Sequence, residues 1–149
     1  MQLDVRAEAD ILSPRAEVAA FAMEAENDPE WIGGISSARR VTDPPTVVGT
    51  RVERVARFLG RRIDYGMEVA EHQPAERIVL RSIKSPFPMR VTYEFVEGPR
   101  GTRAAIRVEG DPGAMYRIGG PVMAALVRRS ITRDLRNLKR LMESSARPV

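Results

Sequence analysis

The stretch PVMAALVRRSITRDLRNLKRLMESS, from Pro121 to about Ser145, decides the fold of this 149-residue chain. A helix of about two dozen residues is roughly 36 Å long at 1.5 Å per residue, so it needs an equally extended surface to pack on. The stretch therefore predicts a long C-terminal helix lying across a sheet. Its apolar residues recur at spacings of three and four, the period of an amphipathic helix; they are Met123, Leu126, Val127, Ile131, Leu135, Leu138, Leu141 and Met142.

The opposite face of this helix is basic. Arg129, Arg133, Arg136 and Arg140 follow one another at offsets of four, three and four. Charged helix faces are usually solvated surface, so we expect this basic stripe to contribute little to stability. A contact between the stripe and a partner is the alternative interpretation, and the sequence leaves it open.

The chain before the terminal helix is mostly strand. Alternating apolar and polar residues predict a strand from Leu3 to Ile11. Ser13 as N-cap with Pro14 at the first helical position predicts a helix of two to three turns, and residues 27–30 begin a very short helix that carries Trp31. Further strands are expected at Ile35 to Val41, Val47 to Leu59, Arg62 to His72, Arg77 to Ile83, Phe87 to Glu97 and Thr102 to Glu109. This order predicts one α+β domain over residues 1–149, with a curved antiparallel sheet of six to seven strands.

Hairpin pairing predicts which side chains face the terminal helix. A turn at Gly60-Arg61 pairs Phe58 with Ile63, and a turn near Pro99-Arg100 pairs Tyr93 with Ile106. The first hairpin then also pairs Ala56 with Tyr65, Arg54 with Met67 and Val52 with Val69, and Glu68 lies beside Arg81 on the outer face. The predicted inward set is Val52, Arg54, Ala56, Phe58, Ile63, Tyr65, Met67, Val69, Leu80, Met89, Val91, Tyr93, Phe95, Ala104, Ile106 and Val108. The candidate ligand-binding residues are this set with Trp31, Tyr116, Met123, Leu126 and Val127.

Arg54 is the exception on that apolar face. A guanidinium left unpaired in a core would cost several kcal/mol, so Arg54 needs a partner. The possible partners are the inward-facing Glu71, the helix residue Asp134 and a ligand oxygen. The alternative is a local bulge, or a side chain that reaches water at the pocket mouth. Tyr65 and Tyr93 share this face, and each phenol needs either an internal partner or a ligand carbonyl.

Composition excludes several kinds of chemistry. The chain has no cysteine and one histidine, His72, which the hairpin pattern puts on the outer face, so we expect no metal site and no cofactor. No phosphate-binding glycine loop and no nucleophile elbow is present. The 20 acidic residues are interspersed among the 24 basic ones, so a net charge of +4 does not predict nucleic-acid binding. No apolar run is long enough to span a membrane, and the lack of cysteine favours a cytoplasmic location.

Several motifs together resemble a known family. They are Ser13-Pro14 with Val18 and Phe21, the segment Asn27 to Trp31, Val48-Gly49-Thr50-Arg51, Tyr65 with Glu68 and Val69 ahead of Gln73-Pro74-Ala75-Glu76-Arg77, and the Leu135 to Leu141 end of the helix. This pattern is similar to the helix-grip fold of the START/Bet v 1-like (SRPBCC) superfamily, and most of all to its bacterial polyketide cyclase/dehydrase-like branch. The resemblance implies a bent sheet around the terminal helix, with a cavity that family members use for lipids, sterols, polyketides or hormones. It implies no catalytic residues, because the family shares no catalytic set.

Three functions remain open at this point. The leading hypothesis is a protein that binds a small hydrophobic molecule, lipid or polyketide-like, between the sheet and the helix. The second is a polyketide cyclase/dehydratase acting on a poly-β-keto chain, in which Arg54, Tyr65 and Tyr93 polarise carbonyls or move protons. The third is a partner-binding module with a filled core. A cavity of several hundred Å³ would separate the first two from the third; the sequence leaves the ligand and the oligomeric state open.

Overall fold

The computed structural model of the chain describes residues 3–111 and 119–146. Over these residues the strands form one antiparallel sheet of seven strands in the order β1-β7-β6-β5-β4-β3-β2. The strands are β1 (Leu3–Ile11), β2 (Ile35–Arg40), β3 (Arg51–Phe58), β4 (Arg61–Gln73), β5 (Arg77–Lys84), β6 (Met89–Gly98) and β7 (Gly101–Gly110). The helical segments are α1 (Arg15–Met23), the 3-10 turn η1 (Ala25–Asn27), α2 (Asp28–Trp31) and α3 (Gly120–Ala146). The predicted α+β helix-grip fold is confirmed.

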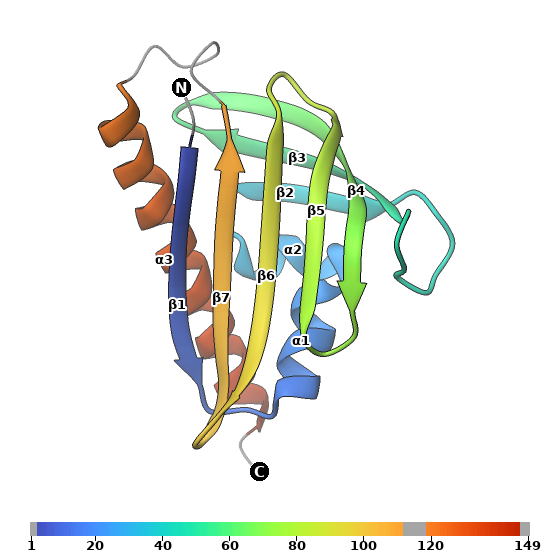
Figure 1. Cartoon of the computed structure of the whole chain (residues 1–149), viewed down its shortest axis with the longest axis vertical. Helices are drawn as coiled ribbons and strands as arrows, with labels where there is room; N and C mark the ends of the chain where they lie inside the picture. Colours follow the sequence, from blue (N-terminus) through green and yellow to red (C-terminus); the bar gives the residue numbers. More distant parts are fainter. Residues whose placement is uncertain (1–2, 112–118, 147–149) are drawn as a thin grey trace.

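The sheet is strongly curved, and the helices lie on its concave face. In Figure 1, β2 and β3 run almost across β6 and β7, and α3 lies behind β1 and β7. The α3 residues Met123, Ile131, Leu135, Leu138 and Met142 are buried in the common core with the inner residues of the sheet. The opposite face of α3 carries the exposed basic stripe, as its spacing predicts. No helix within the described residues is long and apolar enough to cross a membrane.

Two predicted boundaries are wrong for local reasons. Pro14 has an extended backbone and is the N-cap, so α1 begins at Arg15, and the Ser13 hydroxyl donates to the Glu17 carboxylate instead of capping the helix. The strand expected from Val47 begins only at Arg51. The preceding residues form a turn in which the Val47 N–H donates to the Thr50 side chain and Gly49 adopts a φ of 94°, a conformation that favours glycine.

The β3–β4 hairpin has the predicted inner face but a different register. Its turn is Leu59-Gly60, with φ values of 51° and 78°, the geometry of a two-residue type I′ turn. Val52 therefore faces Met67 and Arg54 faces Tyr65, two residues away from the predicted pairing. A shift of two residues leaves every side chain on its original face. The β6–β7 register is confirmed, including Phe95 opposite Ala104 and Tyr93 opposite Ile106.

A β-bulge at Ala70 reverses the face of the last residues of β4. Val69 pairs with Leu80, but Glu71 pairs with Val79, so one residue is inserted between them. Glu71 is consequently exposed on the outer surface, where it pairs with Arg77 at 3.4 Å and Arg90 at 3.6 Å, and the prediction that it faces inward is wrong. The predicted outer position of His72 is also wrong. It pairs with the buried Ile78 and lies on the inner face, half-buried.

Candidate ligand-binding site

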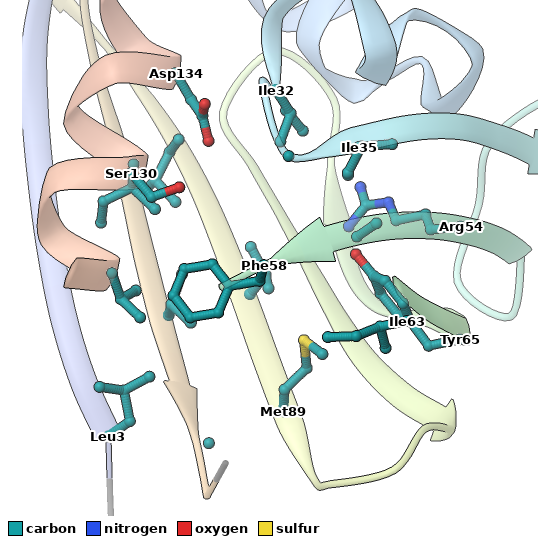
Figure 2. A pocket seen from close by; sticks show the side chains of 18 of the residues that line it. Leu3, Ile32, Ile35, Arg54, Phe58, Ile63, Tyr65, Met89, Ser130 and Asp134 are labelled. Atoms are coloured by element: carbon teal, nitrogen blue, oxygen red, sulfur yellow. The ribbon is translucent and has the colours of Figure 1, made fainter. Parts of the chain in front are cut away.

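A cavity of about 190 Å³ lies between the concave face of the sheet and the N-terminal half of α3. It is partly open to solvent, and its wall is almost entirely apolar. Figure 2 shows side chains from the sheet, the α2–β2 loop and α3 pointing into one space. Its lining residues are Leu3, Ile32, Gly34, Ile35, Arg54, Ala56, Arg57, Phe58, Ile63, Tyr65, Phe87, Met89, Val91, Tyr93, Ile106, Val108, Glu109, Gly110, Met123, Val127, Ser130, Ile131 and Asp134.

Most of the predicted site residues lie on this wall. The structure brings together Arg54, Ala56, Phe58, Ile63, Tyr65, Met89, Val91, Tyr93, Ile106, Val108, Met123 and Val127. Among the others, Trp31, Met67, Phe95 and Ala104 are buried in the core, and Leu126 is half-buried outside the cavity. Val52, Val69 and Leu80 line a second, much smaller cavity. Tyr116 lies outside the described residues.

The helices before β2 explain why part of the predicted face is covered. Helix α1 packs on β6 and β7 with its buried Val18, Ala19 and Ala22. Trp31 of α2 packs edge-on against Tyr93, with ring centroids 5.6 Å apart and an angle of 62° between the planes. The concave face is therefore filled at the α1 end and stays hollow toward the start of α3.

The α2–β2 loop contributes wall residues that the sequence did not predict. Ile32 and Gly34 of the loop, with Ile35 at the start of β2, reach the cavity because the loop is fastened to α3. The Gly33 N–H donates to Oδ1 of Asp134 at 3.0 Å, and the Asn137 side chain donates to the Trp31 carbonyl at 3.2 Å. The available sequence signal was the Gly33-Gly34 pair after Trp31, which marks a close approach of backbone to a neighbouring element.

Arg54 has an internal partner, Asp28 of α2. Its Nη2 lies 2.7 Å from Asp28 Oδ2, its Nε donates to the same oxygen at 2.9 Å, and Nη2 also donates to the Tyr93 hydroxyl at 3.4 Å. The exposed fractions are 4% for Arg54 and 1% for Asp28. The predicted partners Glu71 and Asp134 are therefore wrong, because Glu71 faces outward and Asp134 holds the Gly33 N–H.

Burial and pairing act against each other in this ion pair. Burial raises the pKa of Asp28, although the nearby guanidinium of Arg54 acts to lower it. Burial acts to lower the pKa of Arg54, but Asp28, Tyr93 and Tyr65 together act to raise it and hold that pKa above its ordinary value. Burial also raises the pKa of Tyr65 and of Tyr93, which keeps both phenols protonated at neutral pH. The inner end of the cavity is thus polar but carries no net unpaired charge.

Asp134 and Ser130 form a second polar group on the α3 wall. They are four residues apart, which is one helical turn, and both side chains point toward the cavity (Figure 2). Burial raises the pKa of Asp134 to about 6, against the opposing effects of the Gly33 N–H and Arg133. This carboxyl exchanges its proton close to neutral pH, unlike an ordinary exposed aspartate.

Within residues 3–111 and 119–146, no cluster of histidine and acidic side chains has the arrangement of a metal site. The chemistry that this wall offers is apolar contact with two polar groups, one around Arg54 and one around Asp134.

Residues 2–143 match the family described as polyketide cyclase / dehydrase and lipid transport. The chain belongs to this family. The resemblance seen in the sequence to the polyketide cyclase/dehydrase-like branch is thereby confirmed. No curated protein matches the chain.

Solved structures of similar fold include proteins of different description. TTHA0849 from Thermus thermophilus is 20% identical, with 97% of this chain and 99% of that chain covered and a TM-score of 0.80. The Zhui aromatase/cyclase from Streptomyces sp. R1128 is 13% identical, with 99% and 97% covered and a TM-score of 0.82. A START superfamily protein from Mycobacterium smegmatis is 13% identical, with 97% and 99% covered and a TM-score of 0.77. At these identities the similarity establishes the fold alone.

Proposed function

We propose that this family member binds a small hydrophobic molecule in the cavity between the sheet and α3. The observation that supports it is the cavity itself: about 190 Å³ bounded almost wholly by apolar side chains. Protein interiors pack to the density of organic crystals and contain few voids larger than a water molecule. Filling an apolar cavity of this size with an apolar molecule is favourable, because empty cavity surface destabilises the protein.

The cavity counts against a partner-binding module with a filled core. It is smaller than the several hundred Å³ that the sequence-based hypothesis anticipated, but far larger than the space of a few waters. We therefore assign ligand contact to the wall residues that were predicted from the sequence and that converge here, among them Ala56, Ile63, Val91 and Ile106. A cytoplasmic location stays a prediction from composition.

A polyketide cyclase/dehydratase is the second candidate, and Asp134 is the observation that favours it. A buried carboxyl with a pKa of about 6 on the wall of a cavity suits general acid or base catalysis near neutral pH. The family description and the aromatase/cyclase of similar fold are consistent with this activity. Arg54 supports it less than the sequence suggested, because its charge is already balanced by Asp28.

Native mass spectrometry of the protein as purified tests the binding proposal, with a retained apolar molecule as the expected result. Ala56→Phe places a large side chain in the cavity and should abolish retention while the protein stays folded. Ala20→Phe, on the exposed face of α1, is the matched control and should retain the molecule. Equal retention by the two variants would place the ligand elsewhere, and an empty wild-type protein that also ignores added apolar compounds would refute binding.

A further inference from the structure

The size of the cavity restricts the ligand, given the proposed function. An engineered apolar cavity of about 150 Å³ accepts benzene, whereas pockets for drug-sized molecules span about 300 to 1,000 Å³. At about 190 Å³ this cavity lies close to the lower case. One or two fused rings, or a short chain of equal volume, fit it. The cavity cannot enclose a sterol, a diacyl lipid or a long poly-β-keto chain, which would extend through its open side.

The Arg54–Asp28 ion pair limits how far a ligand can extend into the inner end of the cavity. Arg54 and Tyr93 line both the main cavity and the small second cavity, so they form the partition between the two. Asp28 lies on the far side of that partition, and its contact with Arg54 holds the guanidinium in place. In Figure 2 the head of Arg54 and the hydroxyl of Tyr65 meet at this end of the space. A ligand cannot extend further without breaking a buried ion pair.

The charges around the cavity disfavour an anionic ligand. Four ionisable groups other than tyrosines line it: Arg54, Arg57, Glu109 and Asp134. Arg54 is neutralised by Asp28, Arg57 is exposed, and Glu109 lies 3.7 Å from Arg107. The buried group that remains is the Asp134 carboxyl, whose exposed fraction is 4% and whose Oδ1 lies 3.8 Å from the exposed guanidinium of Arg133. A ligand carboxylate would therefore lose its hydration without gaining an unpaired buried cation, and it would approach a second carboxylate.

The Asp134 carboxyl can also make a polar contact with the ligand. Oδ1 of Asp134 accepts the Gly33 N–H, while Oδ2 accepts no hydrogen bond from any residue in the described part of the chain. Asp134 projects toward the cavity with Ser130 one turn away (Figure 2). An unpaired acceptor oxygen on a buried side chain favours a ligand with an O–H or N–H donor at this position.

We propose that the ligand is a neutral molecule of one or two rings that carries a hydroxyl or N–H group and donates it to Oδ2 of Asp134. Arg54 acts as the partition of the site, and the polar recognition comes from α3. This selection is more restrictive than hydrophobicity alone, because it distinguishes molecules that have the same ring system.

Isothermal titration calorimetry at pH 7.5 with probes of one ring system tests this selection. The probes are 2-naphthol, 2-methoxynaphthalene, which lacks the donor, and 2-naphthoate, which is anionic; cholesterol is the large competitor. We expect 2-naphthol to bind at least tenfold more tightly than 2-naphthoate and about fivefold more tightly than the methyl ether, and cholesterol not to displace it. Asp134→Asn should remove the preference for 2-naphthol over the ether. Asp64→Asn, a matched change on the exposed face of β4, should leave the preference intact.

The possible outcomes separate this inference from the proposed function. Binding of 2-naphthoate as tight as that of 2-naphthol overturns the charge selection, and displacement by cholesterol overturns the size limit. An unchanged preference in Asp134→Asn overturns the assignment of the donor site. Each of these results leaves a hydrophobic binding site in place. A wild-type protein that binds none of the four compounds overturns the inference, and if it is also empty as purified it overturns the proposed function as well.

Discussion

Nη2 of Arg54 lies 2.7 Å from Oδ2 of Asp28 inside the apolar core, and the two residues come from β3 and α2. This ion pair fastens a four-residue helix to the concave face of the sheet. The same helix carries Trp31, which packs against Tyr93. The pair thus fixes the position of the inner end of the cavity wall. Its primary role is structural, and any contact with a ligand is secondary.

Breaking this ion pair from one side should be costly. Arg54→Met leaves Asp28 buried without its partner, and Asp28→Leu leaves Arg54 in the same condition, so each should lower the free energy of unfolding by about 3 to 5 kcal/mol. The double variant Arg54→Met/Asp28→Leu should recover most of this loss, because well-packed apolar residues replace a buried pair at little cost. Urea unfolding of the four proteins measures the cycle. Additive losses in the double variant would mean that the two side chains do not act as a pair.

Asp134 should make stability depend on pH in a defined window. Its pKa is raised from an ordinary 3.8 to about 6, so the folded protein binds this proton more tightly than the unfolded chain does. The resulting stabilisation is fully present below about pH 4 and is lost as pH rises through 6; for a shift of this size it amounts to about 2 to 3 kcal/mol. Asp134→Asn keeps an acceptor for the Gly33 N–H and removes the titration. Urea midpoints from pH 4 to 7 should therefore fall less in the variant than in the wild type, and parallel curves would contradict the prediction.

Gly101 should not tolerate a side chain. A Cβ there would collide with the carbonyl oxygen of Ile11 and the backbone of Ser13, where β1 leads into α1. Gly101→Ala should lower the melting temperature markedly, since neither backbone segment can move without disturbing the β1–β7 pairing. Gly98 is its partner across the same turn, and a Cβ on Gly98 meets atoms only at 3.9 Å. Gly98→Ala is thus the control, and equal effects of the two changes would show that the crowding at Gly101 is relieved cheaply.

The basic stripe of α3 should matter little for stability. Arg129, Arg133, Arg136 and Arg140 are exposed, and exposed charges contribute about 0 to 1 kcal/mol each. Arg133 differs because its guanidinium lies against Gly33 and 3.8 Å from Asp134. Changing the other three to Gln should leave the melting temperature nearly constant. RNA binding by the wild type that falls steeply with salt and disappears in this variant would assign the stripe a role in nucleic-acid recognition.

The sequence predicted which side chains of a strand face inward more reliably than it predicted the pairing between strands. Alternation along residues 52–58 and 63–69 identified the inner side chains, and a register error of two residues did not change them. The error arose at the turn, because Leu59 is not a residue expected at positive φ. The bulge at Ala70 had no comparable signal: an inserted residue inside an alternating run reverses the faces of Glu71 and His72 without changing the composition.

The candidate site was only partly predictable, for reasons of distance along the chain. Arg54 was recognised as a charge that required a partner, but Asp28 resembled an ordinary residue at the start of a helix. Only the placement of α2 over the sheet brings the two together. The volume of the cavity is the space that the curved sheet encloses minus the volume of the side chains inside it. Alternation patterns report neither quantity.

Strand β1 pairs along its whole length with β7, from Leu3 opposite Gly110 to Ile11 opposite Thr102, and α3 packs against β1. The first strand of the sheet is therefore completed by the last strand and the last helix. This topology gives the fold a high contact order, which slows folding because a long loop must close before the pairing is rewarded. While the chain is being synthesised, β1 has no native partner strand until residues 101–110 have left the ribosome.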